Sequence, residues 1–105
     1  MTVVAYVPDL MDRSRVSAVV PDVAFVGRPE GLAAAVASGD VALVDLGRAG
    51  ALEVLPRLLA SGARVIAFGA HVDQDTLDAA RAAGCEEVLA RSAVFRTLGD
   101  LVNPT

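Results

Sequence analysis

The chain has 105 residues, which is enough for one domain (residues 1–105) with one modest hydrophobic core. The chain has nine arginines, no lysine and thirteen acidic residues, which gives a net charge of -4. No basic patch typical of nucleic-acid-binding proteins is evident, so no nucleic acid is expected as a partner. Lysine-dependent chemistry is excluded as well. No apolar run approaches the roughly 18 residues of a membrane span, and the first residues lack signal-peptide features. Together with a single cysteine, this predicts a cytoplasmic protein without membrane contact.

Five apolar segments predict strands, and each is followed by a segment that predicts a helix. The expected strands are Val3 to Val7, Asp22 to Val26, Val41 to Leu46, Arg64 to Gly69 and Glu87 to Ala90. The helices are expected over Leu10 to Val20, Pro29 to Ser38, Ala51 to Ser61, Asp73 or Asp75 to Gly84, and Ser92 to Val102. Asp9 and Ser92 are the expected N-caps of the first and last of these helices, and Pro56 is expected to delay or kink the third.

The segment Val41 to Leu46 is the predicted centre of the fold. It is apolar without alternation until Asp45, which is typical of a strand covered on both faces. Strands that alternate with helices form a parallel sheet between two helical layers. We therefore predict an α/β fold, a (βα)5 three-layer sandwich whose five parallel strands run in the order 2-1-3-4-5.

The chain resembles the receiver domains of bacterial two-component response regulators over about residues 2 to 102. The segments that carry this resemblance are Val41-Ala42-Leu43-Val44-Asp45-Leu46, Val65 to His71, Ala79 to Gly84, and Val88-Leu89-Ala90-Arg91-Ser92. The resemblance implies a flavodoxin-like fold. It also places Asp45 where the family carries its phosphoryl-accepting aspartate.

Other positions depart from the family's pattern. Val7 and Pro8 stand where the resemblance would place two Mg²⁺-binding acids, with Asp9 as a lone neighbour. Gly69 replaces a hydroxyl residue, and Arg91 replaces a lysine. The aromatic residue expected on the fifth strand is also missing, since valine stands there. These departures indicate a pseudo-receiver, which keeps the fold without the phosphoryl switch.

Asp9, Asp45, Gly69, His71 and Arg91 should meet at one corner, because the carboxyl ends of parallel strands share one edge of the sheet. Asp45 and Arg91 are expected to form an ion pair there. His71 is the single histidine, and no cysteine or carboxylate lies at the spacing of a metal-binding motif from it, so no metal site is predicted. No cofactor motif is present. No nucleophile and base can be paired from the sequence, so no enzymatic activity is expected.

Three functions remain open at this point. The first is a non-catalytic signalling or regulatory module that binds a protein partner or a second copy of itself. The resemblance implies that the contact surface would be built from Asp75–Gly84, Glu86–Ala90 and Ala93–Val102. The second is an atypical phospho-accepting receiver that uses Asp45. The third is a small-ligand-binding domain that uses the carboxyl edge of the sheet.

Overall fold

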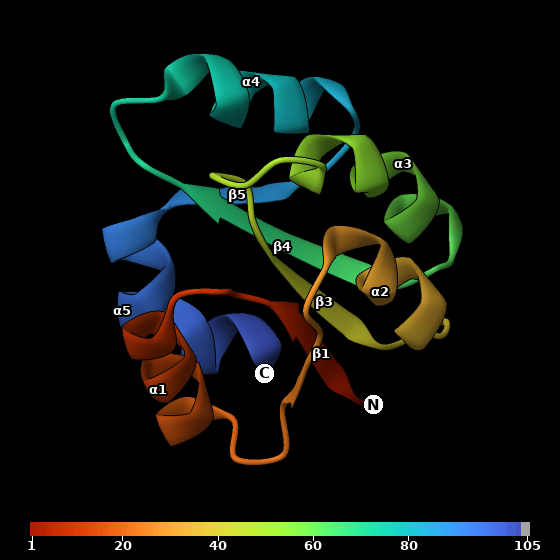
Figure 1. Cartoon of the computed structure of the whole chain (residues 1–105), viewed down its shortest axis with the longest axis vertical. Helices are drawn as coiled ribbons and strands as arrows, with labels where there is room; N and C mark the ends of the chain where they lie inside the picture. Colours follow the sequence, from red (N-terminus) through yellow and green to blue (C-terminus); the bar gives the residue numbers. More distant parts are fainter. Residues whose placement is uncertain (104–105) are drawn as a thin grey trace.

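The computed structural model describes residues 1–103 and has a five-stranded parallel sheet in the order β2-β1-β3-β4-β5, as predicted (Figure 1). The strands are β1 (Val3–Tyr6), β2 (Ala24–Phe25), β3 (Val41–Asp45), β4 (Arg64–Gly69) and β5 (Glu87–Ala90). The helices are α1 (Leu10–Val19), α2 (Pro29–Ala35), α3 (Ala51–Ala60), α4 (Gln74–Ala82) and α5 (Arg91–Val102).

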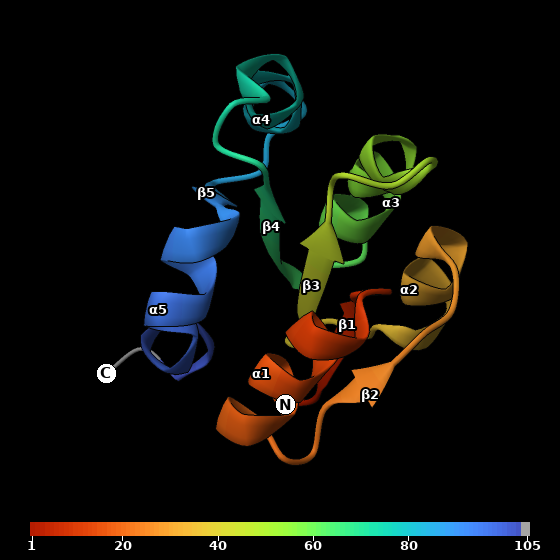
Figure 2. The same ribbon diagram turned by 60° about the vertical axis from the view of Figure 1, so that its left-hand side comes forward.

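Two separate hydrophobic cores lie on the two faces of the sheet. Helices α1 and α5 cover one face, and α2, α3 and α4 cover the other (Figure 2). The first core joins Val16 of α1 and Leu98 of α5 to Leu43 and Phe68 of the sheet. The second joins residues of α2, α3 and α4, among them Leu32, Leu55 and Leu77, to Val44 of β3. The fold is therefore the predicted three-layer sandwich.

Strand β3 lies at the centre and is buried along its whole length, as its unbroken apolar run predicts. Successive side chains of a strand point to opposite faces. Val41 and Leu43 belong to the core under α1 and α5, whereas Ala42 and Val44 belong to the other core. By this alternation Asp45 points toward α1 and α5, and that direction determines which side chains it can meet.

The structure corrects several predicted boundaries. Strand β2 has only two residues, Ala24 and Phe25, which pair with β1 at one edge of the sheet. Helix α2 ends at Ala35 rather than near Ser38; the carboxylate of Asp40 accepts a hydrogen bond from the Ala37 amide and so supports a turn there. The prediction that Ser92 caps the last helix is wrong. That helix begins at Arg91, with Ala90 as its N-cap and without a capping side chain.

Proline does not interrupt α3. The helix is continuous over Ala51–Ala60, and Pro56 lies inside it on the exposed side. The hydrogen bond that proline cannot donate is thus lost where water can replace it. Within residues 1–103, none of the helices is long and apolar enough to cross a membrane.

Candidate functional site: the carboxyl edge of the sheet

Asp45 is a buried acid at the end of the central strand. Only 1% of its surface is exposed, and its Oδ1 atom accepts a hydrogen bond of 2.9 Å from the Gly47 amide. Burying a carboxylate is costly unless it is paired and hydrogen-bonded. The Gly47 amide satisfies one oxygen of Asp45, so the other oxygen needs a cation.

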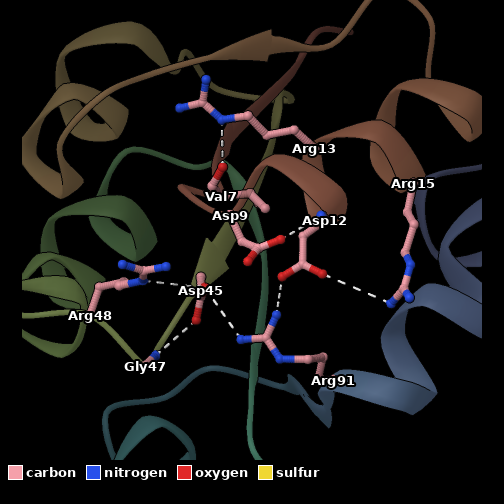
Figure 3. Close-up of polar contacts among 9 residues, drawn as sticks. All are labelled: Val7, Asp9, Asp12, Arg13, Arg15, Asp45, Gly47, Arg48 and Arg91. Carbon is pink, nitrogen blue, oxygen red and sulfur yellow. Dashed lines mark hydrogen bonds and ion pairs between the residues drawn. The ribbon is translucent and has the colours of Figure 1, made fainter.

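Arg91 supplies that cation from the junction of β5 and α5. Its Nη2 atom lies 3.4 Å from Oδ2 of Asp45, so the expected contact between these two residues is present (Figure 3). The other terminal nitrogen, Nη1, donates to Oδ2 of Asp12. The guanidinium also lies over the ring of Phe68, with its central carbon 5.2 Å from the ring centroid. Arg91 therefore bridges two acids above an aromatic face.

Asp12 is the residue of this site that the sequence analysis missed. It lies on α1 and is only 5% exposed, one of two buried charged residues in the described part of the chain. Val16, the other buried residue of α1, follows it by four positions, which places both on one side of the helix. This i, i+4 spacing from Val16 is the feature of the sequence that could have placed Asp12 on the buried side of the helix. The other polar residues near Asp12 made that side hard to recognise.

Two further arginines flank the pair of acids. Arg15 approaches Oδ1 of Asp12 and Arg48 approaches Oδ2 of Asp45, each at 3.9 Å. The corner thus holds an alternating row of charges, in the order Arg15, Asp12, Arg91, Asp45 and Arg48 (Figure 3). The two outer side chains are about half exposed. Exposed pairs at this distance contribute little to stability, so Arg91 is the main counter-charge.

Asp9 lies beside this row but serves its own helix. It is the N-cap of α1, as predicted, and its carboxylate accepts a hydrogen bond of 3.0 Å from the Asp12 amide. This hydrogen bond is the main cause that lowers the pKa of Asp9, with smaller contributions from the Met11 amide and the charges of Arg91 and Arg48. No group of three potential metal ligands occurs among residues 1–103.

Gly69 and His71 are the remaining two residues that were predicted to meet at this corner. Gly69 ends β4 and is buried; a Cβ atom there would meet Leu77 and Leu46 at ordinary contact distances of 3.4 and 3.7 Å. His71 is exposed in the loop that follows, and only its backbone carbonyl takes part in the contacts found there, accepting from the Gln74 side chain. The structure therefore joins Asp45 and Arg91 directly, but not His71.

The hollows of the surface give little support to a small-ligand site at this edge. An open depression of about 270 Å³ lies beside Arg91, lined by Ala70, His71, Ala90, Arg91 and Ser92. A larger one of about 420 Å³ lies at the other end of the sheet, where β1 begins and α5 ends. The hollow beside Arg91 has a mainly apolar lining, but it is wide open to solvent, whereas the third function needs a concave pocket that buries most of its ligand.

Cys85 belongs to the core and not to the site. It is buried, and its thiol lies 3.6 Å from the carbonyl oxygen of Val65. Burial raises the pKa of this thiol, which disfavours the reactive thiolate.

Comparison with known proteins supports the fold. No protein-family model and no curated relative matches the sequence. Among solved structures, the chain is similar to one described as the crystal structure of a response regulator from Thermotoga maritima, with a TM-score of 0.75 and 15% sequence identity. The match covers 96% of this chain and 92% of that chain. At this identity the similarity establishes a receiver-like fold.

Proposed function

We propose that the chain is a receiver-like signalling module that works by contacting another protein and has no phosphoryl switch. One observation carries this proposal: the guanidinium of Arg91 bridges Asp12 and Asp45 at the corner where a receiver would take its phosphoryl group. The receiver-like fold supports the signalling role. The bridge that Arg91 forms between the two acids supports the proposal that the phosphoryl switch has been lost.

Phosphorylation of Asp45 would require a free carboxylate oxygen and a divalent cation next to it. Both oxygens of Asp45 are engaged, one by the Gly47 amide and the other by Arg91. A hard cation needs several oxygen ligands, but Val7 and Pro8 contribute no side-chain oxygen. The alternative function, an atypical phospho-acceptor, therefore requires Arg91 to leave two buried acids without their shared cation.

The contact surface that fits this proposal is the edge of the sheet formed by α4, β5 and α5, over Asp75–Gly84, Glu86–Ala90 and Ala93–Val102. Arg81 of α4 pairs with Asp78 at 2.9 Å and also donates to the carbonyl oxygen of Val88 in β5 at 3.3 Å. This side chain covers part of the edge of β5, which disfavours pairing with another strand. A partner would instead contact the mixed apolar and charged face of the two helices.

The switch can be tested by NMR titration of the protein with Mg²⁺ and beryllofluoride, a phosphoryl analogue. We expect no saturable shift of the Gly47 amide signal, because Arg91 holds the acid that the analogue must reach. We also expect no Mg²⁺ affinity tighter than about 1 mM. Saturable binding that Asp45→Asn abolishes would contradict the proposal and favour the phospho-accepting alternative.

The contact surface can be tested for self-association by analytical ultracentrifugation. If a second copy is the partner, Arg96→Glu should weaken the dimer at least about tenfold, because a reversed charge within an interface creates repulsion. Arg96 is exposed on α5. The matched control is Arg57→Glu, which reverses an exposed charge on α3 outside the proposed surface. A dimer that both variants weaken equally would contradict this surface.

A further inference from the structure

The corner beneath Arg91 has the features of a cation-binding site. Asp12 and Asp45 are 5% and 1% exposed, and each accepts a hydrogen bond from a different terminal nitrogen of one guanidinium. The ring of Phe68 lies under the same group. We infer that Asp12, Asp45 and Phe68 form a binding site for an alkylguanidinium ion, which Arg91 fills from within the chain. This inference deepens the proposed function, since it rests on the same closed corner.

The geometry selects a guanidinium over other cations. A planar fork can donate from separate nitrogens to separate carboxylates while its flat face stacks on an aromatic ring. A compact ammonium ion lacks both the fork and the flat face. A divalent metal needs more oxygen ligands than this corner offers, since no group of three potential ligands lies together within residues 1–103.

The site belongs to the scaffold rather than to Arg91. Asp12 comes from α1, Asp45 from β3 and Phe68 from β4, three elements that the packing of the core holds in place. Arg91 comes from a fourth place, the start of α5, and its side chain is 38% exposed. Truncation of Arg91 would thus leave the two acids and the ring in position and open the site to solvent.

Chemical rescue of Arg91→Ala tests the inference. Ethylguanidinium at about ten times its dissociation constant should raise the Tm of this variant by roughly 5–10 °C. Wild-type protein, whose site is filled, should show no rise at the same concentrations. Ethylammonium, with the same charge, and urea, with a similar planar shape, are the matched control ligands and should not stabilise the variant.

Further variants make the result decisive. Rescue should disappear in Arg91→Ala combined with Asp45→Asn or Asp12→Asn, because each removes one carboxylate. If Arg91→Ala does not fold alone, ethylguanidinium should restore its dispersed NMR spectrum, and Arg91→Ser provides a second variant with a short side chain for the same titration. Absence of rescue in both Arg91 variants, or equal rescue by ethylammonium, would overturn the inference. The beryllofluoride titration of wild-type protein remains a separate test of the proposed function.

Discussion

Phe68→Ala is expected to lower the free energy of unfolding by about 3–5 kcal/mol, the range typical of large-to-small changes at buried aromatic residues. Phe68 lies in β4 and has no exposed surface. Its ring packs edge to face against Phe95, with the centroids 5.4 Å apart, and it supports the guanidinium of Arg91. The truncation would leave a cavity between the sheet and α5. Urea denaturation at several temperatures would measure the loss.

Phe25→Ala is the matched control for this prediction. Phe25 also has an arginine over its ring, since Arg13 lies 5.1 Å from the centroid, but it stands on the edge strand β2 and is only partly buried. Its truncation should cost clearly less, about 1–2 kcal/mol, because less apolar surface leaves the core. If both variants lost the same free energy of unfolding, burial of the ring in the core would not explain the destabilisation by Phe68→Ala.

The sequence predicted the strand order and the central strand because these depend on local and strong signals. The apolar run of β3 is long and does not alternate, and glycines at positive φ follow α3 and α4 at Gly62 and Gly84. The edges were predicted less well. Strand β2 pairs with β1 over only two residues, and α5 begins directly where β5 ends, without a capping side chain to mark its start. Both are properties of the assembled sheet.

The candidate site was predicted in part, for a similar reason. The place of Asp45 and Arg91 in the site could be predicted because both residues stand at the carboxyl ends of predicted strands. The structure brings them into contact. Asp12 does not follow from any strand end. It reaches the corner only because α1 packs with Val16 against the sheet, which turns the preceding turn of the helix toward Arg91. A polar residue on the buried side of a short helix is a weak signal until the neighbouring strand ends are known.

Arg91→Ala is expected to lower the free energy of unfolding by about 2–3 kcal/mol, because it leaves two buried carboxylates without their shared cation. The partial exposure of Arg91 keeps this estimate below the cost of breaking a fully buried pair. Circular dichroism during urea denaturation would provide the measurement. Arg96→Ala removes an exposed arginine from the same helix and should cost less than about 0.5 kcal/mol.

A double-mutant cycle separates the charge from the packing of Arg91. Asp45→Asn keeps an oxygen for the Gly47 amide but removes the negative charge that Arg91 neutralises. Once Arg91 is absent, this second change removes an unpaired buried charge, so it should cost little or even stabilise the variant. We therefore expect a coupling energy of about 1–2 kcal/mol between the two positions. Additive effects would mean that Arg91 stabilises the corner by covering Phe68 and not by holding Asp45.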